Sequence, residues 1–380
     1  MINWRYDGIA LRPACRYDRD GAYSGSAIEK DGKLYLYYTG NVMHKGDYDY
    51  ITQGREQNVL CVQSADGQTF DGKRLLMTNA DFPDDMTCHV RDPKVWKQGG
   101  VYKMILGART AENTGCALIY ESVDGTKWRY SSRLATQEYF GYMWECPDLF
   151  ELGGKEVLSV CPQGLIHCDS RFCNVYQSGY FFTDDMTPFG FTEWDTGFDF
   201  YAPQTFLSPD GRRIMIGWLG MTDCEYTSYA EGFERQHCLS VPCELTVKNG
   251  KICRFPIKEL EKLRKECYHI NSTSVYNVRL PFEISAYTQE KFCITLGSAL
   301  RLSYSGGVFL LEHFDVRASG GRKSRKTLLK KCQSIRVLFD TTAVEIYLNG
   351  GEAVISTRFF SEEDEFALSL SGVSGKLFEL

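Results

Sequence analysis

Long apolar runs are missing from this sequence of 380 residues. A membrane-spanning helix needs about 20 consecutive, mostly apolar residues, so none is expected here. The first residues, Met1 to Asp7, also lack the basic start and the apolar stretch of a secretory signal peptide. These absences predict a cytoplasmic chain with no membrane partner.

An excess of basic charge is missing too. Lysine and arginine number 43 against 49 aspartates and glutamates, which gives a net charge of −6. Because a nucleic-acid binder needs a basic face to neutralise phosphates, we predict no nucleic-acid partner. The 15 cysteines form no C-x-x-C pair and do not cluster with the six histidines at zinc spacing. We therefore expect free thiols and no metal site.

Glycine and aromatic residues are abundant, with 35 Gly, 23 Tyr, 23 Phe and 6 Trp. Apolar positions alternate with a period of two, for example at Ile214, Ile216 and Trp218. This period is typical of strands, and pairs such as Asp-Gly and Gly-Gly mark the turns between them. The predicted fold class is all-β.

A repeat is marked by Pro93, Pro147 and Pro203, at intervals of 54 and 56 residues. Each proline is followed by an aromatic residue three positions later and by a glycine seven or eight positions later. A period of this size, built from short strands, is typical of a β-propeller with one four-stranded sheet per blade. Gly25 fits the same frame. Asn3-Trp4 resembles the end-of-blade marker Thr126-Lys127-Trp128, which places Met1 inside a blade, so we expect the first blade to be largely missing.

The pattern changes at residues 256–267, where Leu260 and Leu263 stand among charges as in a short amphipathic helix. We predict a propeller over residues 1–255, a linker helix over 256–267 and a β-sandwich over 268–380. The basic run 322–326 is interpreted as a solvated hairpin, with binding of an anionic partner as the alternative.

Two acids occupy related places in the repeat. Asp92 stands one residue before its frame proline, and Glu145 stands two residues before its own. Because the innermost strands of a propeller begin at one mouth of the channel, both carboxyl groups are predicted to meet there. Hydrolysis of a glycosidic bond needs such a pair. The alternative for each acid alone is an ordinary turn or strand-end carboxylate.

Sugar-binding side chains are expected around this pair, because aromatic faces and fork-shaped donors suit a sugar ring and its hydroxyls. The candidates are Arg91, Trp144, Tyr201, Gln204 and Trp218. Trp144 and Trp218 could equally be aromatics that pack between blades. Tyr201 and Gln204 could belong to the core.

The sequence resembles glycoside hydrolase family 32, the β-fructofuranosidases that include invertase and sucrose-6-phosphate hydrolase. The segments that carry the resemblance are Tyr23–Ala27, Arg91–Pro93, Glu145–Asp148, Asp199–Gln204, Ile216–Trp218, Leu239–Leu245 and Val344–Gly351. Cys243 departs from the pattern, since the family usually has arginine there.

The resemblance implies a five-bladed propeller followed by a β-sandwich, and retaining hydrolysis of terminal β-fructofuranosides such as sucrose or sucrose 6-phosphate. In the family's pattern Glu145 matches the general acid/base and Asp92 the transition-state stabiliser. Arg91, Tyr23 and Ser24 match positions that contact the substrate. Carboxylates suffice for this chemistry, so no cofactor is implied, and the expected partner is a small sugar.

The family's nucleophile is the aspartate of an Asn-Asp-Pro-Asn-Gly motif, and this sequence contains no such motif. A misplaced start, an eroded gene and a second polypeptide are the three explanations considered. For this chain we expect fructoside binding without robust turnover. A fructan exo-hydrolase and a non-catalytic fructoside-binding protein are the alternative functions.

Overall fold

Antiparallel strands make up most of the computed structural model, which describes residues 1–70, 72–224, 226, 236–361, 363 and 365–380. The alternation of apolar and polar residues accounts for these strands, since one face of each is buried. Tight turns join them. Asp31-Gly32 and Asn249-Gly250 both have positive φ at both residues, as type I′ hairpin turns require. No helix among the described residues is long and apolar enough to cross a bilayer.

The described chain forms two compact units. The first, which we call the blade unit, holds Arg5–Leu165 and Gly179–Thr192. The second, the sandwich unit, holds Met1–Trp4, Ile166–Ser178 and Glu193–Leu380.

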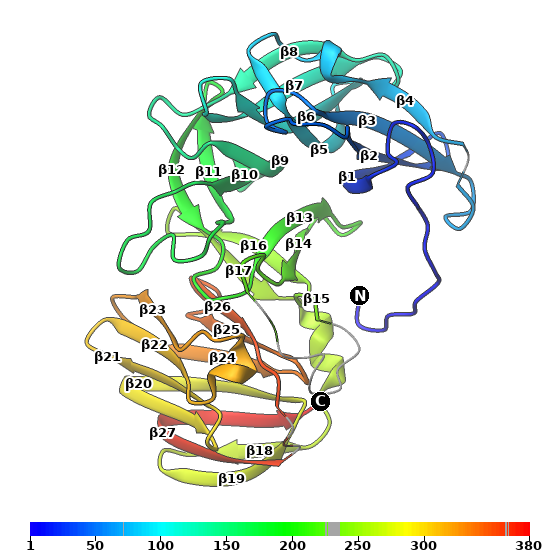
Figure 1. The fold of residues 1–380 in the computed structure, drawn as a ribbon. Coiled ribbons are helices and arrows are strands. Elements are labelled where there is room, and N and C mark those ends of the chain that lie inside the picture. The colour runs from blue at the N-terminus through cyan, green and yellow to red at the C-terminus, as the bar shows by residue number, and fades with distance from the viewer. Residues whose placement is uncertain (71, 225, 227–235, 362, 364) are drawn as a thin grey trace. The chain divides into compact units, whose positions relative to one another are not determined.

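Three four-stranded antiparallel sheets build the blade unit (Figure 1). In each sheet, consecutive strands pair with one another, as in the blade of a propeller. The first sheet is β1 (Gly21–Lys30), β2 (Lys33–Met43), β3 (Arg55–Ser64) and β4 (Arg74–Met77). The second is β5 (Met86–Gln98), β6 (Val101–Thr110), β7 (Gly115–Ser122) and β8 (Arg129–Leu134). The third is β9 (Met143–Leu152), β10 (Lys155–Gln163), β11 (Gly179–Asp184) and β12 (Thr187–Glu193).

The sequence repeat corresponds to a β-bulge in the first strand of each sheet. The pairing register shifts between Arg91 and Lys94 in β5, and at the equivalent place in β1 and β9. The residue before the frame proline has a left-handed backbone, with φ of 63° at Asp92 and 47° at Cys146. Bulges bend a strand and re-aim its side chains, and they occur often beside functional sites. The sequence repeat therefore marks the bulge at which the first strand of each sheet changes the direction of its side chains.

A fourth sheet of the blade type lies in the sandwich unit. Its strands are β13 (Tyr201–Leu207), β14 (Arg213–Leu219), β16 (Cys243–Lys248) and β17 (Lys251–Pro256), and the short β15 (Cys238–Leu239) pairs with β14. It repeats the bulge, between Tyr201 and Gln204, and Ala202 has a φ of 47°. The described residues thus form four blades, so the five-bladed expectation is wrong for this structure. The linker 256–267 contains a 3-10 helix, Lys258–Leu263, instead of an α-helix.

One ten-stranded sheet completes the sandwich unit and forms a β-sandwich-like fold. The two halves of the long strand β20 pair with different neighbours, β24 and β21, while β27 pairs along both halves. Side chains from all these strands fill one apolar core. The strands are β18 (Cys267–Ile270), β19 (Ser274–Arg279), β20 (Phe282–Leu296), β21 (Leu300–Ser305), β22 (Val308–His313), β23 (Ser324–Leu328), β24 (Ser334–Phe339), β25 (Ala343–Leu348), β26 (Ala353–Arg358) and β27 (Glu365–Glu379).

The basic run 322–326 lies in the connection between β22 and β23 and at the start of β23. A hairpin forms there as expected, but two of its arginines are not solvated. Arg322 donates two hydrogen bonds to the buried carboxylate of Asp199, at 3.0 and 2.7 Å, and Arg325 donates to Asn174 Oδ1 at 2.6 Å. The interpretation as a wholly solvated hairpin is therefore wrong, because these cations are used inside the sandwich unit.

Candidate active site

Arg91 and Glu145 meet where the bulges of β5 and β9 lie side by side (Figure 1). The guanidinium donates from Nη2 to Glu145 Oε1 at 2.6 Å and from Nε to the same oxygen at 3.0 Å. The side chains are mostly buried, with 9% and 17% exposed, so water screens this ion pair little. The predicted convergence of the two repeats at one place is thus present in the blade unit.

Asp92 joins the same cluster through the backbone of β9. Its Oδ2 accepts a hydrogen bond from the Cys146 amide at 2.9 Å, and its own amide donates to Thr39 Oγ1 at 2.9 Å. Burial raises the pKa of Asp92 to about 6, with Arg91 opposing the rise and Glu145 adding to it. Arg91 donates hydrogen bonds to Glu145, Gln57 and His89, and burial is the larger influence on the pKa of Asp92.

The second oxygen of Glu145 is held by Gln163, a residue that the sequence interpretation missed. Gln163 Nε2 donates to Glu145 Oε2 at 2.7 Å. Gln163 lies two residues beyond Cys161, the cross-strand partner of Glu145, and therefore on the same face of the sheet. Knowing the register of β9 and β10 would have revealed it.

Arg91 is fixed in turn by His89 and Gln57, which were also missed. Arg91 Nη1 donates to His89 Nδ1 at 2.9 Å and to Gln57 Oε1 at 3.2 Å. Since arginine only donates, Nδ1 must accept, so the ring proton lies on Nε2, 3.0 Å from the Tyr50 carbonyl oxygen. Burial, followed by the charge of Arg91, lowers the pKa of His89 to about 4. His89 is therefore neutral at neutral pH.

Tyr23 and Ser24 lie in the bulge of β1, between the register positions Ala22 and Gly25. Both residues are exposed, Tyr23 by 41%. The strand is tied to β5, because the Val95 amide donates to Ser26 Oγ at 2.9 Å. Both residues are thus presented at the surface of the blade unit at the equivalent place in the repeat.

Trp144 is buried in the core between the second and third sheets. None of its side chain is exposed, its ring packs on Phe181 at 5.5 Å, and Nε1 donates to the Phe140 carbonyl at 2.8 Å. Neighbouring residues on a strand point to opposite faces, so the turn that presents Glu145 buries Trp144. The structure supports the packing alternative for this residue.

Tyr201, Gln204 and Trp218 lie in the sandwich unit, on β13 and β14. Tyr201 and Trp218 are cross-strand partners with ring centroids 6.4 Å apart in an edge-to-face arrangement. Trp218 also lies 5.1 Å from the His237 ring. Tyr201 is buried, whereas Gln204 and Trp218 are partly exposed. The two partly exposed side chains are the better placed to meet a ligand.

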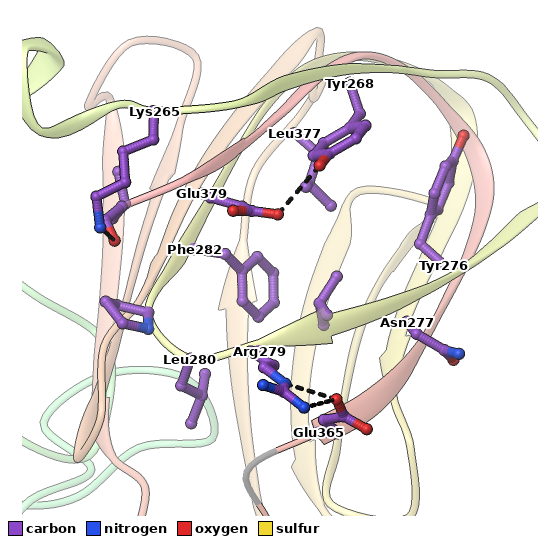
Figure 2. A pocket seen from close by; sticks show the side chains of 13 residues that line it. Lys265, Tyr268, Tyr276, Asn277, Arg279, Leu280, Phe282, Glu365, Leu377 and Glu379 are labelled. Carbon is purple, nitrogen blue, oxygen red and sulfur yellow. Dashed lines mark hydrogen bonds and ion pairs between the residues drawn. The ribbon is translucent and has the colours of Figure 1, made fainter.

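A separate pocket of about 560 Å³ opens in the sandwich unit between the ends of β19 and β27 (Figure 2). Tyr268 donates to Glu379 at 3.1 Å, and Arg279 is paired with Glu365. None of the predicted site residues lines this pocket. Across the part of the chain that the structure describes, no group of three His, Cys, Asp or Glu residues could hold a metal ion.

The cluster in the blade unit can perform acid–base chemistry on a polar ligand. It combines the carboxyl groups of Asp92 and Glu145 with the Arg91 guanidinium, which is held by hydrogen bonds to its neighbours. Glycosidases use two carboxyl groups in this way, one to move a proton and one to stabilise developing positive charge. Arg91 and its neighbours add hydrogen-bond donors suited to hydroxyl groups.

Comparisons with known proteins agree with this chemistry. A family model of the glycosyl hydrolases family 32 N-terminal domain matches residues 1–256, and one of the family's C-terminal domain matches residues 258–378. The sucrose-6-phosphate hydrolase of Bacillus subtilis is 36% identical over 387 residues, which cover 95% of this chain and 78% of that protein. The raffinose invertase of Escherichia coli is 33% identical over 400 residues, covering 99% and 82%.

Solved structures are similar over nearly the whole chain. The sucrose-6-phosphate hydrolase from Lactobacillus gasseri superimposes with a TM-score of 0.87 at 28% identity, covering 99% of this chain and 82% of that one. A mutant of a Bombyx mori family 32 β-fructofuranosidase, in complex with sucrose, gives a TM-score of 0.84 at 26% identity, covering 98% and 81%.

Proposed function

Because the chain belongs to glycosyl hydrolase family 32, we propose that it binds terminal β-D-fructofuranosides, with sucrose and sucrose 6-phosphate as the intended substrates. The relatives named above are sucrose-6-phosphate hydrolases and an invertase. One observation carries the proposal: the bulges of β5 and β9 bring Arg91, Asp92 and Glu145 into one hydrogen-bonded cluster. A cytoplasmic location remains a prediction from the sequence.

In this proposal Glu145 is the general acid and base. Its carboxyl proton goes to the leaving glucosyl oxygen as the bond from that oxygen to C2 of the fructosyl unit breaks. Asp92 accepts hydrogen bonds from fructose hydroxyls and stabilises the positive charge that develops at C2. Arg91, Tyr23 and Ser24 contact the sugar. In the structure Glu145 accepts three hydrogen bonds from N–H donors, so it must gain a proton before it can act as an acid.

Retaining hydrolysis also needs a carboxylate nucleophile about 5–5.5 Å from the acid. The 380 residues contain no Asn-Asp-Pro-Asn-Gly motif. We therefore propose that the chain with this sequence binds fructosides but turns them over far more slowly than a family member that carries this motif. A non-catalytic fructoside-binding protein is the corresponding second function, and a fructan exo-hydrolase would use the same residues.

Gln204, Trp218 and Tyr201 are proposed as further sugar contacts, with less reason for Tyr201 because it is buried. Trp144 is left out of the sugar site because its side chain is enclosed in the core.

The test combines binding with chemical rescue. Calorimetry should show binding of fructose and sucrose, with loss of affinity in Asp92→Ala. Added azide can take the place of the nucleophile: it attacks C2, the bond from C2 to the glucosyl oxygen breaks, and Glu145 supplies the proton to that oxygen. We expect azide-dependent cleavage of sucrose that falls by about 10²–10⁴ in Glu145→Gln.

Three results would count against the proposal. Absence of fructoside binding would show that the proposed sugar site is wrong. Azide-dependent cleavage at the same rate in Glu145→Gln as in the wild-type chain would show that Glu145 is not the acid. Sucrose hydrolysis at ordinary enzyme rates without azide would contradict the slow turnover. Binding with no rescue would favour the non-catalytic function.

A further inference from the structure

Two arginines without a carboxylate partner lie beside the candidate active site. Arg55 and Arg109 are both only partly exposed, and among the described residues neither forms an ion pair with an acid. Arginine is seldom buried unless it is paired, because its charge loses hydration. Two such groups on one rim of the blade unit therefore indicate a place where an anion can bind.

Strand register places both arginines next to Arg91. Arg55 is the first residue of β3 and stands two residues before Gln57, whose Oε1 accepts from Arg91. Arg109 stands two residues after Gly107, the cross-strand partner of Arg91 on β6. A two-residue step along a strand is about 6.5–7 Å and keeps side chains on one face. Both residues thus lie one two-residue step beyond Arg91 along their strands, toward the strand ends where β5 begins.

The contacts of these two side chains leave donors for a ligand. Among the described residues Arg109 donates to a neutral acceptor, Asn113 Oδ1, at 2.6 and 3.0 Å, and its guanidinium lies over the Tyr142 ring. Arg55 Nη2 lies 3.7 Å from Met43 Sδ, and Arg55 Nε is buried with no hydrogen-bond partner.

The nearby acids are engaged elsewhere. Glu56 binds His44, and Asp85 binds Arg133 through two hydrogen bonds. The carboxylate of Asp49 accepts from the Ile51, Thr52 and Gln53 amides and from the Thr52 hydroxyl of its own loop. These carboxylates therefore do not neutralise Arg55 and Arg109 by direct pairing.

His89 is close enough to both arginines for their charges to act on its ring, and it adds no charge of its own. Its pKa is lowered by burial first, and then by Arg91, Arg55 and Arg109, so all three guanidiniums act on this one ring. Because Arg91 is balanced by Glu145, the uncompensated positive charge is that of the other two.

We propose that Arg55 and Arg109 form a phosphate subsite that binds a phosphate monoester on the leaving-group sugar of the fructoside. The inference rests on the proposed function, because it takes Glu145 as the group that faces the glycosidic oxygen. A phosphate on carbon 6 of the leaving glucose lies about one hexose ring away from that oxygen. This separation matches the step between Arg91 and the two arginines. The guanidinium group of arginine can bind two phosphate oxygens at once through its paired N–H donors.

The experiment compares binding of sucrose 6-phosphate, sucrose and inorganic phosphate by calorimetry. The variants are Arg55→Gln, Arg109→Gln, the double variant, and Arg129→Gln as a matched control on the exposed outer strand β8. We expect the wild-type chain to bind sucrose 6-phosphate at least tenfold more tightly than sucrose. Each single variant should reduce that preference by about tenfold or more, as expected for loss of a hydrogen bond to a charged group.

Affinity for sucrose should change by less than about threefold in every variant, which shows that the variants remain folded. Added salt should weaken binding of sucrose 6-phosphate but not of sucrose. Inorganic phosphate should compete with sucrose 6-phosphate and leave sucrose binding unchanged. Equal affinity of the wild-type chain for the two sugars, or a preference that survives in the double variant, would overturn the subsite. If neither sugar binds, the proposed function itself fails.

Discussion

Replacing Asp92 by asparagine should make the chain more stable at neutral pH while weakening fructoside binding. Asp92 is 6% exposed, and burial raises the pKa of its carboxyl group from 3.8 to about 6. A carboxyl group with a raised pKa in the folded state binds its proton more tightly there than in the unfolded chain. Its contribution to the free energy of unfolding is therefore complete below about pH 4 and is lost as the pH rises through 6.

The size of the effect follows from the shift of roughly two pKa units. At 1.36 kcal/mol per unit, ionisation of Asp92 costs the folded chain about 3 kcal/mol at pH values above 7. Asparagine keeps an oxygen for the Cys146 amide and has no charge to bury. Any fixed cost of its NH₂ group is independent of pH. The free energy of unfolding of Asp92→Asn minus that of wild type should thus grow by about 3 kcal/mol from near pH 4 to near pH 8.

Urea unfolding, followed by circular dichroism at several pH values, measures this difference. Asp18→Asn supplies a control of opposite sign. Although burial of Asp18 opposes ionisation, Lys73 and the Cys15 amide lower its pKa well below the ordinary value. Its ionised form therefore stabilises the folded chain, and the deficit of Asp18→Asn should grow as pH rises. A difference between Asp92→Asn and wild type that stays constant with pH, or that falls, would refute the account of the buried charge.

Three further predictions concern packing and buried charge. Gly107→Ala should cost about 1–3 kcal/mol of stability, because a Cβ there would lie 2.1 Å from the Trp144 carbonyl oxygen; thermal denaturation checks this against Gly72→Ala, where nothing lies within 4 Å. Trp144→Phe should lower the free energy of unfolding by about 1–3 kcal/mol and leave fructoside affinity unchanged, whereas a specific loss of affinity would return Trp144 to the sugar site. Burial raises the pKa of Glu345 to about 7, against the charge of Arg254, so the contribution of Glu345 to wild-type stability should fall by about 3 kcal/mol as pH rises from 4.5 to above 7. Urea unfolding of Glu345→Gln should lack this component of the pH dependence, and an unchanged slope would contradict it.

The repeat of prolines led from sequence to structure most directly. Pro93 and Pro147 gave the frame, and the structure shows that the frame marks a β-bulge at Asp92 and Cys146. Asp92 and Glu145 could therefore be predicted to converge, because the same bulge recurs in neighbouring sheets. This prediction needed only the spacing of residues along the chain, which can be read from the sequence.

The residues that position this cluster could not be predicted in the same way. His89, Gln57 and Gln163 contact Arg91 or Glu145 across strands or between sheets, and such contacts depend on the pairing register. Register is set by tertiary packing, and a slip of one residue reverses the face on which a side chain lies. Trp144 shows the same limit: the sequence located it beside Glu145 but did not fix which of the two was buried.

The proposed function places a fructoside against Arg91, Asp92 and Glu145 in the blade unit. A crystal structure of the Glu145→Gln chain soaked with sucrose would show whether the sugar lies there. We expect the fructosyl ring in hydrogen-bond contact with the Asp92 carboxylate, and residue 145 beside the glycosidic oxygen. Sucrose bound elsewhere on the chain, with this cluster empty, would contradict it.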